Sequence, residues 1–402
     1  MFAIVAAPLF LAVSFALDYA QASKYRVELQ NVADAVALAA VRGLPISENQ
    51  GRIDGMTLYD ALMDRIRAGL LSDGVTITFE QLPDYKAIVE ITAEAKGLFG
   101  NDISLGTVRF EVEASAILGR QSTEIALVLD LSGSMETDRM KALGNALTSF
   151  QTEMQSTQSA KAKLRIATIP FAQSVSLPAF AAGWLSGPKE QALATAAGRT
   201  CFALQGRALD TSIEAPGSRT FTIATDYSRS CMTETATPLT NGFASLQALA
   251  AAFKAPPAWR SDFNNSRNTP YWGTNLFTGA VWAARFLDYG WAAHLPTESR
   301  PETANQTNKF AVLLTDGEQL EVAGITRTQA DANLLSVCEM MRSKGIEVYT
   351  IGFAVNTTSQ ALLTKCAGRP DQFVKASNAT ELVAAYKTIS RQIGDSRARL
   401  VY

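Results

Sequence analysis

The sequence has very little histidine and cysteine. Its 402 residues include a single histidine, His294, and four cysteines, none in a Cys-x-x-Cys pair, so no zinc site is expected. Lys and Arg (36) nearly balance Asp and Glu (38), and the net charge of −2 gives no reason to expect a nucleic acid partner. No Gly-rich phosphate loop, dinucleotide fingerprint or Gly-x-Ser-x-Gly hydrolase frame is present. The apolar content of 47% is ordinary for a globular protein, and the length is enough for two or three domains.

The four cysteines are Cys201, Cys231, Cys338 and Cys366. An even number of widely spaced cysteines is typical of a chain that folds in an oxidising compartment. We predict that Cys201 pairs with Cys231 and that Cys338 pairs with Cys366. Each pairing closes a loop of roughly 30 residues, worth about 3–4 kcal/mol in the chain-entropy model. The sequence alone leaves all three pairings of four cysteines open.

About a third of the way along the chain, a carboxylate and two hydroxyls follow a predicted buried strand. The apolar run 124–129 predicts the strand, and Asp130, Ser132 and Ser134 follow it in a turn that precedes a helical pattern near Asp138. Open α/β sheets place their ligand sites at the carboxyl ends of strands. All three side chains are hard oxygen ligands, which suit Mg²⁺, Mn²⁺ or Ca²⁺ better than a soft metal. The plainer alternative is that they satisfy backbone donors in the turn.

Two later stretches favour the metal site. Thr274 lies in a turn before a helical run, 276–287, and Asp316 ends a second apolar strand, 310–315. In this combination of Asp-x-Ser-x-Ser, Thr and Asp, the sequence resembles the von Willebrand factor A domain. The residues that match the metal-ion-dependent adhesion site of that family are Asp130, Ser132, Ser134, Thr274 and Asp316.

This resemblance implies a fold, a cofactor and a kind of partner. The fold is α/β, a doubly wound and mostly parallel sheet with helices on both faces. The alternation of predicted strands and helices after residue 122 supports the same architecture. The expected cofactor is Mg²⁺, with Mn²⁺ and Ca²⁺ as alternatives. In the family an open position on the metal accepts a carboxylate from a partner protein, so we expect a protein partner here.

The same residues do not form a recognisable catalytic site. Phosphatases with an aspartate nucleophile need a second Asp two residues further on as general acid, and that position holds Ser132. Ser132 lacks the flanking glycines of a hydrolase elbow, and nothing in the sequence ties His294 to it. We therefore expect a binding protein and no enzyme. A hydrolase with a degraded motif is the less favoured alternative.

The first 17 residues are almost entirely apolar. At about 1.5 Å per residue they span roughly 25 Å, just short of a typical hydrocarbon core. The pattern then continues as an amphipathic helix, whose apolar stripe consists of Leu29, Val32, Val36 and Ala39. We predict a single-pass anchor in the inner membrane with the remaining chain outside the cytoplasm. A cleaved signal peptide is the alternative, although no basic segment precedes the apolar run.

The residues of this segment carry a second resemblance. Ala16-Leu17-Asp18-Tyr19 and the run LQNVADAVALAA, 29–40, are similar to the N-terminal segment of TadE/TadG-like proteins of tight-adherence (Flp) pilus systems. TadG-like members of that family also carry a C-terminal A domain. The resemblance implies a TadG-like pilus-assembly protein whose partner is another pilus-assembly component. The alternative is a secreted or pilus-associated surface adhesin that uses the same metal site.

These patterns divide the chain into three parts. Residues 1–45 form the anchoring and amphipathic helix, residues 46–119 a small α+β spacer, and residues 120–402 the A domain. Within the A domain, residues from about 173 to 268 are too many for one strand–helix connection. We interpret them as a mostly surface insertion that contains one helix, 243–253. Because the insertion precedes the Thr274 loop, we expect it to form part of the rim of the metal site.

Overall fold

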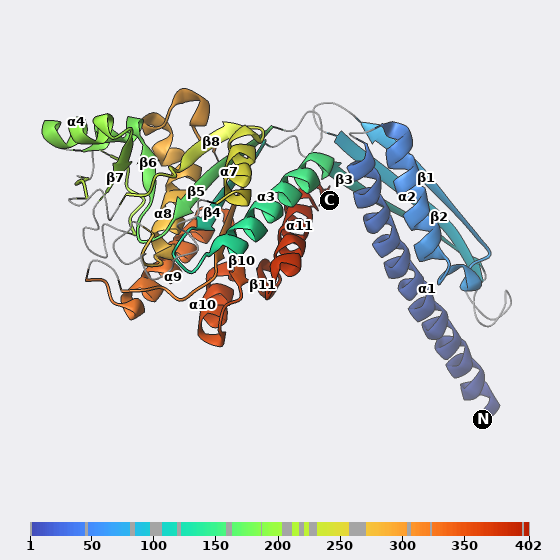
Figure 1. The fold of residues 1–402 in the computed structure, drawn as a ribbon. Helices are drawn as coiled ribbons and strands as arrows, with labels where there is room; N and C mark the ends of the chain where they lie inside the picture. Colours follow the sequence, from blue (N-terminus) through green and yellow to red (C-terminus); the bar gives the residue numbers. More distant parts are fainter. Residues whose placement is uncertain are drawn as a thin grey trace. The chain divides into compact units, whose positions relative to one another are not determined.

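The computed structural model describes most of the 402 residues. The described residues are 2–44, 47–80, 85–96, 107–118, 122–157, 163–185, 187–202, 211–216, 221–224, 231–256, 271–303, 307–321, 324–395 and 398–401. Figure 1 shows them as a ribbon. Internal contacts divide the chain into two compact units, one comprising residues 1–120, 159–161 and 395–402 and the other residues 121–158 and 162–394.

The first unit contains a four-stranded antiparallel sheet. Its order is β1-β2-β3-β12. The strands are β1 (Ser72–Glu80), β2 (Tyr85–Lys96), β3 (Thr107–Leu118) and β12 (Ala398–Val401). Alternate residues of β2 are buried, which is the pattern of a sheet with one covered face. The buried residues are Ala87, Val89, Ile91, Ala93 and Ala95.

Two helices complete the core of this unit. The second half of α1 (Phe2–Gly43) buries Leu29, Val32 and Val36 of the predicted stripe in this core. α2 (Glu48–Met63) packs closely against α1, because a Cβ atom on Gly51 would lie only 2.6 Å from the Ala40 carbonyl oxygen. Among the residues that the structure describes, no helix combines the length and apolar character needed to cross a membrane. The membrane anchor stays a prediction.

Two boundaries differ from the sequence-based division. The segments 1–45 and 46–119 share one core, so the amphipathic half of α1 is part of a folded unit. β12 pairs with β3, with Ala398 opposite Leu118, so the end of the chain returns from the A domain to the first unit. The A domain is therefore inserted between β3 and β12. A four-residue strand without a long apolar pattern gives little signal in the sequence.

The second unit is built on a six-stranded sheet in the order β11-β10-β9-β4-β5-β8. Five strands are parallel, and β8 is an antiparallel edge strand. The connections from β4 and β9 lead to opposite sides of the sheet, so the carboxyl ends of these two strands form the topological switch point. The strands are β4 (Ser122–Asp130), β5 (Leu164–Phe171), β8 (Thr237–Asn241), β9 (Thr307–Thr315), β10 (Ile346–Phe353) and β11 (Phe373–Ala376).

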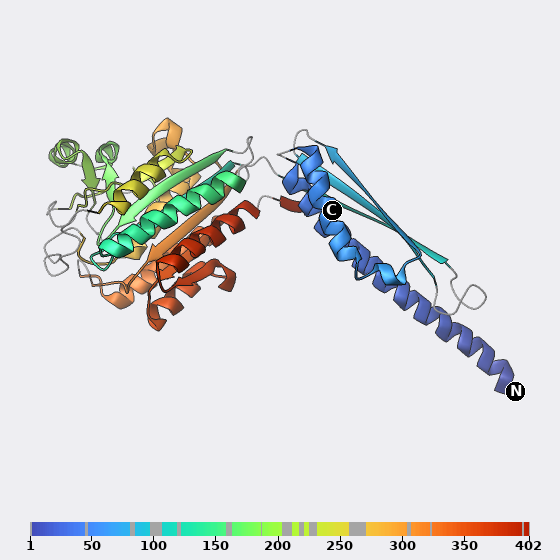
Figure 2. The same ribbon diagram turned by 45° about the vertical axis from the view of Figure 1, so that its right-hand side comes forward.

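Helices cover both faces of this sheet, as predicted (Figure 2). One face packs against α3 (Thr137–Thr157), α7 (Ala244–Lys254) and α11 (Ala379–Asp395). The other packs against α8 (Leu276–Leu287), α9 (Arg327–Ser343) and α10 (Thr357–Ala367). α8 is buried along its whole length and lies close to the sheet, since a Cβ atom on Gly279 would lie 2.5 Å from Cγ1 of Val128.

The predicted insertion is more than a surface segment. It supplies the edge strand β8, and its aromatic side chains pack on α8 and the residues after it. The cluster contains Trp184, Phe202, Phe221, Trp282 and Trp291. Its smaller elements are β6 (Ser176–Pro178), η2 (Ala179–Trp184), α4 (Pro188–Ala196) and β7 (Arg199–Cys201).

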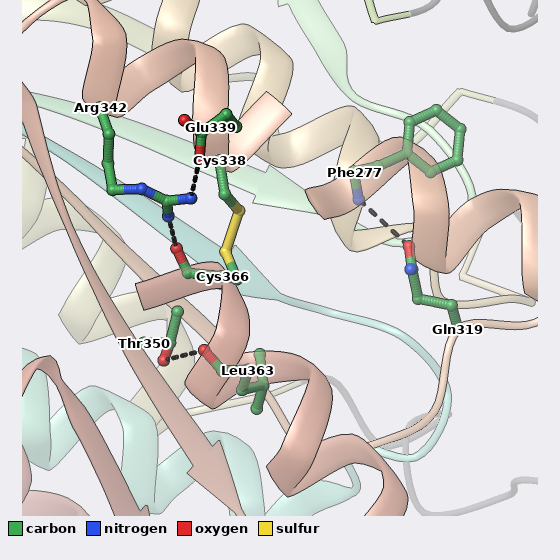
Figure 3. Close-up of a disulfide and its surroundings, with 8 residues drawn as sticks. All are labelled: Phe277, Gln319, Cys338, Glu339, Arg342, Thr350, Leu363 and Cys366. Carbon is green, nitrogen blue, oxygen red and sulfur yellow. Dashed lines mark hydrogen bonds and ion pairs between the residues drawn. A yellow bond between two sulfur atoms is a disulfide. The ribbon is translucent and has the colours of Figure 1, made fainter. Parts of the chain in front are cut away.

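Both predicted disulfides are confirmed. Cys201 is bonded to Cys231 within the insertion, and Cys338 of α9 is bonded to Cys366 of α10. Figure 3 shows the second bond beside Arg342, whose guanidinium donates a hydrogen bond to the carbonyl oxygen of Cys366. The remaining short helices are η1 (Arg67–Gly69), η5 (Tyr289–His294), η6 (Thr297–Ser299) and η7 (Pro370–Gln372).

Candidate metal centre

Asp130 is held rigidly at the carboxyl end of β4. The residue is fully buried, and its Oδ1 accepts a hydrogen bond from the backbone N–H of Ser132 at 2.8 Å. Its Oδ2 accepts from the hydroxyl of Thr315, the last residue of β9, at 2.6 Å. The adjacent strand therefore fixes the orientation of the carboxylate. Thr315 was not among the residues predicted for the site, and a hydroxyl directly before Asp316 is the signal that could have indicated it.

The two serines connect Asp130 to Asp316. The hydroxyl oxygens of Ser132 and Ser134 lie 3.0 Å apart. The Ser134 hydroxyl also donates to Oδ1 of Asp316 at 2.5 Å. Four of the five predicted residues are thus brought together by a continuous chain of hydrogen bonds between the loops that follow β4 and β9.

The fifth residue, Thr274, is placed beside these loops by its backbone. Its carbonyl oxygen accepts from the N–H of Leu320, four residues after Asp316, at 3.0 Å. The N–H of Gly133 donates to the carbonyl oxygen of Tyr271 at 2.9 Å. The side chain of Gln319 accepts from the N–H of Phe277 in the first turn of α8, as Figure 3 shows. Three loops far apart in the sequence therefore meet at the switch point.

The insertion reaches the same loop. The hydroxyl of Tyr271 donates to the carboxylate of Glu234, and it lies 3.0 Å from the hydroxyl of Thr233. Met232, next to the disulfide cysteine Cys231, is buried in the core that contains Leu131. The expected contact between the insertion and the Thr274 loop is therefore present.

Arg139 is a site residue that the sequence did not reveal. It lies in the first turn of α3, and its guanidinium forms an ion pair with Oδ2 of Asp316. The same Nη1 atom lies 3.4 Å from the carbonyl oxygen of Ser134. The guanidinium also lies over the ring of Phe353, 5.9 Å from its centroid. An Arg one helical turn after the Asp-x-Ser-x-Ser turn was the available signal.

The site concentrates negative charge in a buried place. Burial raises the pKa of Asp130 to about 7, and repulsion from Asp316 adds to this rise. Burial also raises the pKa of Asp316, against the opposing effect of its hydrogen bonds with Ser134 and Arg139. One guanidinium faces two carboxylates, so ionisation of both leaves a buried negative charge. A bound cation would offset that charge.

The donor set fits a hard divalent cation. Two carboxylates and three hydroxyls are oxygen ligands of the kind that Mg²⁺, Mn²⁺ and Ca²⁺ use. Within the described part of the chain, no group of three or more His, Cys, Asp or Glu side chains comes together as a metal cluster. A cation here would therefore depend on the hydroxyls and on water to complete its coordination.

The doubly wound sheet with a loop site at its switch point is a von Willebrand factor type A domain. The model of that family, described as von Willebrand factor type A domain, matches residues 292–388, a range that includes Asp316. Residues 1–43 match the model of the Flp pilus-assembly TadE/G-like family. The chain thus combines a TadE/G-like N-terminal segment with an A domain, and both resemblances found in the sequence are confirmed. A search of curated proteins found no match.

Several solved structures are similar in part. The pilus adhesin SpaC from Lactobacillus rhamnosus GG matches in its open conformation with a TM-score of 0.42 and 14% identity, over 81% of this chain and 34% of SpaC. The pilus adhesin RrgA from Streptococcus pneumoniae gives a TM-score of 0.35 and 10% identity, over 79% and 48%. The vWF domain of the type V pili tip protein Mfa5 from Porphyromonas gingivalis gives 0.35 and 11%, over 68% and 95%.

The chain spans about a third of the length of SpaC and about half of RrgA. Likenesses at these TM-scores do not establish what this chain binds. The link to pili comes from the family match of residues 1–43.

Proposed function

We propose that this chain is a pilus-assembly or adhesion protein whose A domain binds a protein partner through a divalent cation. Asp130, Ser132, Ser134, Thr274 and Asp316 would hold the cation, with one or both Asp acting through water. Mg²⁺ is the first candidate, because it prefers oxygen ligands and retains its waters. Mn²⁺ and Ca²⁺ are the alternatives. The N-terminal helix would anchor the chain in the inner membrane, with the A domain outside the cytoplasm.

One observation carries this proposal. Residues from the ends of β4 and β9, 182 positions apart, share a direct hydrogen bond between Ser134 and Asp316 at the switch point. Turns that only satisfy their own backbone donors do not require such a contact between two strands. When both buried carboxylates are ionised, they outnumber the one guanidinium paired with them, and a cation would offset the remaining charge.

Binding is a better interpretation of this arrangement than catalysis. The Ser132 hydroxyl lies beside the Ser134 hydroxyl, and its backbone N–H is bonded to Asp130. His294, the single histidine of the sequence, packs edge-on against the ring of the buried Trp291. The ring contact of His294 is thus with Trp291 and not with either serine of the site. The cation would present an open position to a carboxylate of the partner, another pilus-assembly component.

The test is a calorimetric titration of the full chain with Mg²⁺ and Mn²⁺ after chelation. The wild type should give a saturable heat and a rise in melting temperature. Asp130→Ala should lose both and keep a cooperative thermal transition, because the strand that carries it stays buried. Thr274→Ala should weaken binding less, since water can replace its hydroxyl. Asp138→Ala is the matched control, because that carboxylate is exposed beside the same loop.

The outcome that would overturn the proposal is specific. It is a wild-type chain with neither a saturable heat nor a thermal shift, together with an Asp130→Ala variant that still captures the same partner in pull-downs. A secreted or pilus-associated adhesin would use the same site, so cell fractionation separates the two forms of the proposal. An anchored protein remains with the inner membrane, and an adhesin is recovered from the medium or from pili.

A further inference from the structure

Arg139 is the one positively charged side chain that an ion pair places on the candidate metal centre among the described residues. Its side chain is 38% exposed, whereas the side chain of its partner Asp316 is fully buried. The guanidinium therefore lies between the buried carboxylate and solvent. It is anchored on its other sides by the Ser134 carbonyl oxygen and the ring of Phe353.

The position of Arg139 matters because its charge changes the net charge of the metal centre. In the doubly ionised form that would hold a cation, the two carboxylates and the guanidinium of Arg139 carry a combined charge of −1. A divalent cation bound there would raise the charge to +1. Without Arg139 the same loaded site would be neutral. Arg139 therefore opposes the entry of a cation and increases the attraction of the loaded site for an anion.

We infer that Arg139 is a specificity-determining residue of this site, acting as a built-in counter-ion that lowers the affinity for the cation and makes the loaded site select a carboxylate ligand. This inference rests on the proposed cation site. In the absence of the cation, Arg139 holds the side chain of Asp316. When the cation is bound, Arg139 remains a donor at the solvent edge of the site, where the carboxylate of a partner would arrive.

A purely structural role for Arg139 predicts something different. If the ion pair only fixed the loop of Asp316, its removal would misplace a ligand and weaken the binding of both the cation and the carboxylate. A counter-ion role predicts changes of opposite sign. Removing Arg139 should strengthen cation binding and weaken carboxylate binding. Measuring both affinities on one variant therefore separates the two roles.

The experiment uses the full chain, Mn²⁺ as the cation and acetate as the carboxylate. Mn²⁺ affinity is measured by electron paramagnetic resonance of the free ion. Acetate binding is then followed by the loss of water-proton relaxivity on the Mn²⁺-loaded protein. Arg139→Gln should bind Mn²⁺ about tenfold more tightly and acetate at least about threefold more weakly than the wild type. Its cation-free form should melt at a lower temperature, because Asp316 loses its partner.

Two further variants complete the design. Arg139→Lys keeps the charge and should return both affinities toward the wild type. Lys141→Gln removes the same charge from the same helix, where Lys141 pairs with the exposed carboxylate of Asp138, and it should change neither affinity. An Arg139→Gln chain that binds Mn²⁺ more weakly or equally, or that binds acetate unchanged, overturns the inference. A wild type that does not bind Mn²⁺ overturns the proposed function itself, so the two failures are distinguishable.

Discussion

Among single residues, Asp130 determines how the cation-free A domain responds to pH. Its pKa is raised from 3.8 to about 7 in the folded state by burial and by Asp316. A raised pKa means that the folded state favours the protonated carboxyl. The contribution of Asp130 to the free energy of unfolding should therefore be greatest below pH of about 4 and should fall as pH rises through about 7, by up to about 4 kcal/mol. Mg²⁺ should reverse this trend, because it binds the ionised form.

Denaturant unfolding of chelated protein between pH of about 4.5 and 8 measures this effect. Asp130→Asn is the control, because its amide cannot ionise and the variant should lack the part of the pH dependence that Asp130 contributes. A wild type whose stability rises relative to Asp130→Asn over this range would contradict the sign derived above.

A second residue, Glu124, governs the opposite end of the central strands. It is fully buried at the start of β4 and forms ion pairs with Arg165 of β5 and Lys309 of β9, whose Nζ lies 2.9 Å from its Oε2. Glu124→Gln should lower the free energy of unfolding by about 3–5 kcal/mol, because two buried cations lose their main counter-charge. It should leave cation affinity unchanged, since the network lies at the other end of the sheet from Asp130.

The matched control for Glu124 is an exposed pair. Glu153→Gln removes a carboxylate that pairs with Arg391, a side chain that is 63% exposed, and should change stability by less than about 1 kcal/mol. Chemical denaturation followed by tryptophan fluorescence measures both variants. Equal effects of the two substitutions would show that the buried Glu124 network contributes no more to the free energy of unfolding than the exposed pair does.

Among the elements, the long apolar ones could be predicted and the short polar ones could not. α8 begins and ends where the sequence predicted, because its mostly apolar residues specify a helix that is buried along its whole length. β8 has the sequence Thr-Pro-Leu-Thr-Asn, and its proline is tolerated because β8 is an edge strand. Such a segment resembles a loop in the sequence. The same limit applies to Arg139, whose partner lies 177 positions away.

The contact between α1 and α2 gives a prediction at this scale. Gly51→Ala would ordinarily favour a helix by about 1 kcal/mol. Here the new Cβ would lie 2.6 Å from the carbonyl oxygen of Ala40, a backbone atom that cannot move aside cheaply. Overpacking costs about 1–3 kcal/mol, so we expect a net loss of roughly 1–2 kcal/mol from the first unit. Hydrogen exchange of the α1 and α2 amides should become faster.

Gly74→Ala in β1 is the control for this substitution. Its Cβ would lie 3.4 Å from the hydroxyl oxygen of Thr92, an ordinary contact with a side chain, so the stability of the unit should be unchanged or slightly raised. If the α1 amides exchange as slowly in Gly51→Ala as in Gly74→Ala, the close contact between α1 and α2 does not determine the stability of this unit.

For the molecule as a whole, the main feature is that the chain returns to its first unit after it has formed the A domain. The chain leaves the first unit after β3, forms the A domain, and returns as β12 to pair with β3. Both ends of the A-domain segment therefore continue along the chain into strands of the same sheet. The sequence predicted a C-terminal A domain. It did not reveal the pairing of Ala398 with Leu118, because the two paired segments are separated by the entire domain.

This arrangement predicts that the two units respond differently to the loss of β12. Truncation after Asp395 removes four residue pairs from β3 and should destabilise the first unit by roughly 2–4 kcal/mol, at about 1 kcal/mol for each lost ladder hydrogen bond. All five tryptophans lie between residues 184 and 291, so tryptophan fluorescence reports the A domain alone. Its unfolding midpoint and its Mn²⁺ affinity should stay unchanged, while the β3 amides exchange faster.

An isolated chain of residues 121–394 should show the same midpoint and affinity, because both hydrophobic clusters of the six-stranded sheet lie within it. A fluorescence midpoint that falls together with the protection of β3 would show that the two units unfold as one, and the A domain would then depend on the sheet into which it is inserted.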